Sequence, residues 1–241
     1  MIDDALFGRV SRRIDSYRED MIELQKALTA IPALGPENGG DGEFEKARFL
    51  ESYLLSAGFR EVIHCDAPDP RVSSGVRPNL VVRVPGKTGK KTVWVLTHMD
   101  TVPPGERSLW DGDPYEAIVK DGKICGRGTE DNQQDLVASL FAARAVMDEG
   151  IEPDASMGLA FVSDEETASS YGLPHLLETM GPLFEKTDWI VVPDFGNRRE
   201  PSSRSPRKAS FGSGSGPWAA SATPARPPRA STRSPPLHTW S

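Results

Sequence analysis

Cysteine is scarce in this sequence, which has Cys65 and Cys125 among its 241 residues. The two lie far apart, and neither belongs to a CxxC or other zinc-binding spacing. The pattern therefore indicates neither a disulfide framework nor a thiolate metal site. It fits a reducing compartment, and we expect a cytoplasmic protein.

Long apolar runs are missing as well. No stretch approaches the roughly 20 apolar residues that cross a bilayer, and the acidic start Met-Ile-Asp-Asp-Ala-Leu-Phe does not fit a secretory signal. We therefore expect a soluble chain without a membrane partner.

Basic residues are few before position 198 and frequent after it. The segment from Arg198 onward holds eight of the 28 basic residues and one of the 35 acidic ones, so positions 1–197 have 20 basic against 34 acidic residues and a net charge of −14. Because nucleic acids attract basic surfaces, we expect no nucleic-acid partner for that acidic part.

Apolar spacing predicts helices and strands in alternation. Apolar residues three and four positions apart predict helices over 11–31, 44–55, 134–147 and 173–180. Short β-rich runs predict strands over 61–65, 79–84, 92–97, 157–163 and 189–192. Strands that alternate with helices indicate a layered α/β domain.

Candidate ligands follow the strand over 92–97. His98 and Asp100 come directly after it, and the period-two alternation of a strand points both side chains toward the same side. One can bind a metal ion while the other supports it. Taken alone, the segment also fits a surface turn with an incidental histidine.

A glycine-rich segment presents Asp131. Gly126-Arg-Gly-Thr-Glu-Asp131-Asn follows a short strand-like run, so the glycines allow a sharp turn just before the helix predicted to begin near Gln134. A carboxylate at that place can bridge two cations. It can also be the N-cap of the helix, and the two roles are compatible.

Acidic residues follow two further strands. Asp164, Glu165 and Glu166 lie together after the strand over 157–163, where their mutual repulsion favours a compensating cation or proton. Asp194 follows the strand over 189–192. The alternative for the triplet is a solvated acidic turn.

Together these positions offer one imidazole and several carboxylates at the carboxyl edge of an open sheet, where α/β proteins build their sites. Such a donor set suits Zn2+, with Co2+ or Mn2+ as alternatives. Two such ions about 3.5–4 Å apart can activate a water molecule and polarise a carbonyl group.

The ordered set of motifs resembles the peptidase M20 family, which includes acetylornithine deacetylase, succinyl-diaminopimelate desuccinylase, aminoacylases and dipeptidases. The resemblance covers roughly residues 12–197. It rests on His98-Met-Asp100-Thr-Val-Pro, Trp110 with Pro114, the segment from Gly126 to Asn132, Ser163-Asp-Glu165-Glu166 and Pro193-Asp194-Phe-Gly.

The resemblance implies a two-metal hydrolase that cleaves an amide bond of an N-acyl amino acid or short peptide. His98, Glu166 and Asp194 would each bind one ion and Asp131 would bridge both, although family members differ in which ion Glu166 and Asp194 bind. Asp100 would orient His98. Glu165 would be the general base. The peptide after Asp131 is often cis in this family.

The sequence also departs from the family. Members run to roughly twice this length, with a lid and dimerisation domain and a final segment that each supply a histidine. The resemblance thus implies a three-layer zinc-peptidase-like α/β catalytic domain with a mixed sheet over residues 1–197, incomplete at its C-terminal end and without the lid that mediates homodimer formation. We expect this chain itself to be nearly inactive, and the alternative is a non-catalytic metal-binding remnant or interaction module.

Residues 198–241 are rich in serine, proline and arginine, and lack apolar periodicity. This composition predicts a disordered tail, in which His238 is not expected to bind metal. A shifted reading frame permits a peptide that looks like the family's lid-domain histidine motif. We hypothesise a frameshift near residues 197–199, which the coding DNA would test.

Overall fold

A mixed sheet is the centre of the fold. The computed structural model describes residues 3–167 and 169–194. Its five-stranded sheet has the order β1-β4-β8-β5-β9. These strands are β1 (Ile63–His64), β4 (Leu80–Val84), β5 (Thr92–His98), β8 (Ser156–Val162) and β9 (Trp189–Val191). β8 pairs antiparallel with β4 and parallel with β5, and β5 pairs parallel with β9.

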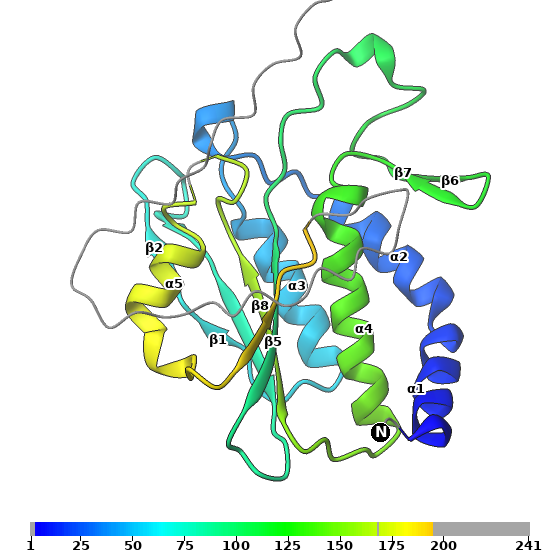
Figure 1. Ribbon diagram of the computed structural model, residues 1–241. Coiled ribbons are helices and arrows are strands. Elements are labelled where there is room, and N and C mark those ends of the chain that lie inside the picture. Colours follow the sequence, from blue (N-terminus) through cyan, green and yellow to red (C-terminus); the bar gives the residue numbers. More distant parts are fainter. Residues whose placement is uncertain (1–2, 168, 195–241) are drawn as a thin grey trace, which may run out of the picture. The chain divides into compact units, whose positions relative to one another are not determined.

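Helices cover both faces of this sheet, which gives three layers (Figure 1). The helices are α1 (Asp4–Ser16), α2 (Arg18–Thr29), α3 (Phe44–Ser56), α4 (Gln134–Asp148) and α5 (Leu173–Met180). Leucines of α2, α3 and α4 pack with β4 and β8 in one buried cluster. Leu176 of α5 packs with Trp94 and Val162 on the other face. The predicted layered α/β fold is confirmed.

A tryptophan and a glycine lie side by side on the neighbouring strands β5 and β8. Trp94 of β5 is fully buried, and its ring fills the space beside Gly158 of β8. A Cβ atom at Gly158 would lie 2.1 Å from the Trp94 ring. The glycine therefore makes room for the indole between two strands whose carboxyl ends carry the candidate site.

The predicted helix over 11–31 is wrong in its bounds. The structure has two helices that meet at Tyr17, and the first begins earlier because the Asp3 carboxylate caps it by accepting hydrogen bonds from Ala5 and Leu6. Apolar spacing missed this start because α1 buries no residue. At the junction, the buried Tyr17 hydroxyl donates to Asp148, 2.5 Å away.

The other long elements agree with the sequence. α3, α4 and α5 lie where predicted, and β4, β5, β8 and β9 match their predicted strands to within a residue or two. The predicted strand over 61–65 is shorter, since β1 has two residues. Two small hairpins were not predicted as pairs: β2 (Ala67–Pro68) with β3 (Val76–Arg77), and β6 (Ile118–Lys120) with β7 (Lys123–Cys125).

The serine- and proline-rich segment over 198–241, with His238, lies outside the described residues. In the described part of the chain, no helix has both the length and the apolar character needed to cross a membrane.

Candidate metal centre

The candidate residues lie at one edge of the sheet because their strands are parallel. His98 is the last residue of β5, and Glu165 and Glu166 follow β8. Asp194 follows β9. The carboxyl ends of parallel strands meet at the same edge, so residues almost 100 positions apart come together.

Three of the predicted ligands converge. The Nε2 atom of His98 lies 3.0 Å from an Asp131 carboxylate oxygen and 3.5 Å from an Asp194 carboxylate oxygen. One ligand atom of each residue lies within 4.8 Å of the other two. The His98 side chain is 2% exposed, whereas Asp131 is 62% and Asp194 is 30% exposed. The imidazole of the set is thus buried in the core, while its two carboxylates reach solvent.

Glu166 does not join this converging set among the described residues. Its backbone N–H is fixed by Asp100, and its carboxyl group is close enough for the charge of Asp131 to affect it. The charge of His98 also acts on the Glu166 carboxyl group and favours its ionised form.

Asp100 has two kinds of contact. Its carboxylate lies 3.3 Å from Nδ1 of His98, and its backbone oxygen lies 3.1 Å from the same nitrogen. The two carboxylate oxygens also accept hydrogen bonds from the N–H groups of Glu165 and Glu166, at 3.1 and 3.0 Å. The sequence pattern predicted the contact with His98 and missed the contacts with the two glutamates.

The loop before α4 gives Asp131 its position. Gly128 has a left-handed backbone (φ 83°), and a Cβ atom there would lie 2.6 Å from Thr101. The peptide bond between Asp131 and Asn132 is cis. The cap position of α4 belongs to Gln133, and no side chain caps the helix end. The alternative that Asp131 is the helix N-cap is therefore wrong.

Asn132 is a site residue that sequence reasoning did not assign a role. Its side-chain Nδ2 donates to Asp194, 2.8 Å away, and its Oδ1 accepts from the His98 backbone N–H at 3.4 Å. One amide thus links the end of β5 to Asp194, which lies three residues after the end of β9. The only signal in the sequence was its place directly after Asp131.

The third acid of the triplet points elsewhere. Asp164 is 1% exposed and lies 3.7 Å from the Arg77 guanidinium. The expected repulsion among three neighbouring acids is relieved for Asp164 by this arginine and not by a cation in the site. A solvated acidic turn is also wrong for Asp164, because it is buried.

The electrostatics of the site favour a cation. Burial lowers the pKa of His98, but the hydrogen bond to Asp100 and its charge outweigh this and raise it to about 9. Burial, with the charge of Asp131, raises the pKa of Glu166 to about 7. Burial also raises the pKa of Glu165, and that of Asp135 to about 6. Carboxylates that resist ionisation around one imidazole are the surroundings that a divalent cation stabilises.

A cavity of about 210 Å³ opens beside the converging set. Its polar lining includes His98, Asn132, Glu165 and Asp194, and its apolar lining includes Leu96, Val162, Leu173, Pro174 and Val192. The remaining described histidines lie elsewhere: His64 is on β1 beside Glu51, and His175 is on α5.

Comparison with known proteins assigns the family. Residues 94–206 match the sequence profile of peptidase family M20/M25/M40, a stretch that includes every residue of the converging set. An uncharacterised metallohydrolase of Methanocaldococcus jannaschii is 39% identical over 186 residues, which are 74% of this chain and 44% of that protein. The chain belongs to the M20 peptidase family.

Other M20 proteins show similar partial coverage. A succinyl-diaminopimelate desuccinylase of Alkalilimnicola ehrlichii is 34% identical over 173 residues, 72% of this chain and 42% of that protein. The solved structure of human carnosine dipeptidase 1 shares the fold, with a TM-score of 0.68, 24% identity, and coverage of 79% of this chain and 41% of its own. The chain thus spans less than half the length of these relatives.

Proposed function

We propose that this chain carries the metal centre of an amide hydrolase. The observation that supports it is the convergence of His98, Asp131 and Asp194 at the carboxyl edge of the sheet. One neutral imidazole with carboxylates is a donor set for Zn2+, Co2+ or Mn2+. His98 binds through Nε2, because its Nδ1 faces Asp100.

We assign the roles from these contacts and from the family resemblance. His98, Asp131 and Asp194 would hold one divalent ion, and Asp131 with Glu166 would hold a second. Two such ions would supply the Lewis acidity that acidifies a water molecule and polarises the carbonyl group of the substrate. Asp100 orients the imidazole of His98 and fixes which ring nitrogen faces the site.

Glu165 is the proton carrier in this proposal. It lines the same cavity as His98 and Asp194, and Asp100 holds its backbone N–H. A carboxylate there can take a proton from the attacking water and return it to the leaving amine. Burial raises the pKa of Glu165 toward neutral pH, which suits both proton transfers.

The substrate class is an N-acyl amino acid or a short peptide. Relatives of this chain are named as desuccinylases and, at the level of fold, a dipeptidase. The apolar wall of the cavity, with Leu173 and Val192, fits the acyl chain or an apolar side chain.

A second candidate is a non-catalytic metal-binding or interaction module. It is favoured by β9, which is the edge strand of the described sheet and exposes Trp189 at 63% and Val192 at 58% beside it. Exposed apolar edges are typical of surfaces that pair with another chain.

One experiment separates the two candidates. The chain is titrated with Co2+, whose binding is followed by calorimetry and visible absorption, and then assayed with N-acetyl and N-succinyl amino acids and dipeptides. Saturable binding that His98→Ala abolishes supports the metal centre. Metal-dependent turnover that Glu165→Gln abolishes, even at the low rate expected of this chain, supports the hydrolase, and binding with no detectable turnover supports the module. The absence of saturable Co2+ binding would overturn the hydrolase and the metal-binding module, and would leave the interaction module.

A further inference from the structure

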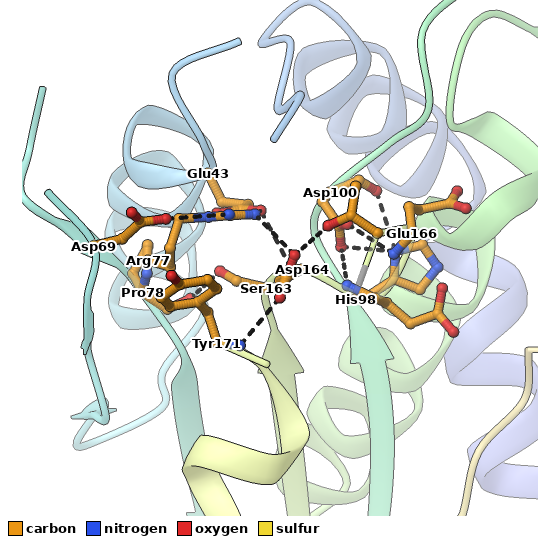
Figure 2. Close-up of polar contacts among 12 residues, drawn as sticks. Glu43, Asp69, Arg77, Pro78, His98, Asp100, Ser163, Asp164, Glu166 and Tyr171 are labelled. Atoms are coloured by element: carbon orange, nitrogen blue, oxygen red, sulfur yellow. Dashed lines mark hydrogen bonds and ion pairs between the residues drawn. The ribbon is translucent and has the colours of Figure 1, made fainter. Parts of the chain in front are cut away.

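A cluster of buried charges lies next to the metal centre. Arg77, Glu43 and Asp69 are 0% exposed, and Asp164 is 1% exposed. The Arg77 guanidinium donates to both carboxylate oxygens of Glu43, with Nε 2.6 Å from one of them. It also lies 3.7 Å from Asp69 and from Asp164. Figure 2 shows these side chains in a row that leads from Asp69 toward Asp100 and His98.

Asp164 is the end of this row, and its backbone is unusual. Its φ is +61°, a left-handed conformation that costs a non-glycine residue on the order of 1 kcal/mol. Its N–H donates to Glu43, 3.3 Å away. Its carboxylate accepts from the Tyr171 N–H at 3.1 Å and from the Thr167 hydroxyl. Both the backbone N–H and the side chain of Asp164 are therefore hydrogen-bonded, and these bonds hold the turn.

The turn determines where the next two residues lie. Glu165 and Glu166 follow Asp164 directly, and their N–H groups both point to Asp100. Between the Glu43 contact at position 164 and the Asp100 contacts at 165 and 166, three successive N–H groups bind carboxylates of other elements. Both glutamates of the site are therefore placed by a backbone that charged side chains hold.

Stability alone does not explain this cluster. A buried ion pair contributes little net stability, because the loss of hydration offsets the attraction between the charges. Nη1 of Arg77 also has no hydrogen-bond partner in the described part of the chain. The ion pair with Arg77 fixes the orientation of the Glu43 carboxylate, one oxygen of which accepts the hydrogen bond from the Asp164 N–H.

We propose that Glu43 and Arg77 are positioning residues that hold the left-handed turn at Asp164 and thereby aim Glu165 and Glu166 at the metal centre. The inference rests on the proposed function for its consequence, but the turn can be tested without metal. Arg77 orients Glu43, Glu43 holds the N–H of Asp164, and the turn sets the two glutamates that follow.

The test compares two variants with a matched control in the 241-residue chain. Glu43→Gln keeps the shape and one acceptor but removes the charge, and Arg77→Met removes the guanidinium. The control is Glu149→Gln, because Glu149 also pairs with arginines, Arg9 and Arg13, and its side chain is 15% exposed. Glu149 follows the far end of α4, about 22 Å of helix from the loop with Asp131.

Two measurements are made on each protein. Hydrogen exchange of the metal-free chain, followed by mass spectrometry, reports on the segment 163–171 against β4 and β8. Titration with Co2+ reports the affinity and the visible absorption spectrum. We expect exchange in 163–171 at least tenfold faster in both variants while β4 and β8 stay protected, and Co2+ affinity 10–100-fold weaker with an altered spectrum.

The outcomes separate this inference from the proposed function. If the unmodified chain binds no Co2+, the metal centre fails, and hydrogen exchange still decides whether the pair holds the turn. Exchange in 163–171 equal to that of Glu149→Gln would overturn the positioning role, as would uniform acceleration over the whole chain. Should Arg77→Met not fold, the nearly isosteric Glu43→Gln decides the question.

Discussion

Substitution of Asp100 by asparagine is a sharp test of the site geometry. Asp100 is 2% exposed, and its two carboxylate oxygens accept the N–H groups of Glu165 and Glu166. Asparagine keeps one oxygen and turns the other into a donor. One charged hydrogen bond is lost, and two donors face each other.

The expected magnitude follows from these contacts. A hydrogen bond to a charged group contributes about 1.5–3 kcal/mol. The lost charge has opposing effects, because Asp100 repels the carboxylate of Glu43 but attracts Lys46 and His98. Burial already lowers the pKa of Lys46 to about 8, so removal of Asp100 lowers it further. We therefore expect the free energy of unfolding to fall by about 2–3 kcal/mol.

The assay is urea unfolding at pH 7 in the presence of EDTA, followed by far-UV and near-UV circular dichroism. Asp148→Asn is the matched control, because Asp148 accepts a hydrogen bond from Tyr17 at the opposite end of α4. In the same proteins, Co2+ affinity should fall 10–100-fold for Asp100→Asn and stay unchanged for Asp148→Asn. A change of less than 0.5 kcal/mol, on the order of an ordinary surface substitution, with unchanged affinity for Asp100→Asn would refute the reasoning.

Three further predictions follow from the same geometry. The pKa of His98 is raised to about 9, so without bound metal its contribution to stability is fully present below its unfolded pKa of about 6.5 and is lost as the pH rises through 9. Unfolding curves at pH 6 and pH 10 should show this loss of stability, and the His98→Gln variant should not show it. Gly128→Ala should lower stability by about 1–3 kcal/mol and weaken Co2+ binding, because an added Cβ meets Thr101 and the backbone is left-handed there; equal Co2+ affinity would contradict this. Gly158→Ala should lower the melting temperature, because its Cβ would collide with the Trp94 ring, and should leave the Co2+ affinity of the folded protein unchanged. A variant as stable as the original would contradict this contact.

The sequence was informative where chemistry or periodicity is local. Apolar spacing predicted α3, α4 and α5 well, because each has one buried face. The rule that parallel strands share a carboxyl edge brought His98 and Asp194 to one place, and the glycine-rich loop before α4 adds Asp131. It could not find the start of α1, which a surface cap at Asp3 determines and no apolar face marks.

The sequence could not reveal contacts between distant charges. Arg77 is the last residue of the short hairpin strand β3 and has no motif around it, yet it binds Glu43, 34 positions earlier, and lies beside Asp164. Three adjacent acids at 164–166 predicted shared repulsion, whereas the backbone turn directs Asp164 into the interior and leaves the two glutamates near the site. The different directions of Asp164 and the two glutamates depend on the backbone φ angle of Asp164, which the amino-acid sequence does not show.

The shared contacts of Asp100 make the centre behave as one thermodynamic unit. The same carboxylate contacts the imidazole of His98 and the backbone of both glutamates. A change on either side therefore shifts the carboxylate that the other side depends on, so double-mutant cycles between the two sides should show coupling energies of about 0.5–3 kcal/mol. Single substitutions that look independent in the sequence would then be epistatic, and the order in which they arise would decide which of them the fold tolerates.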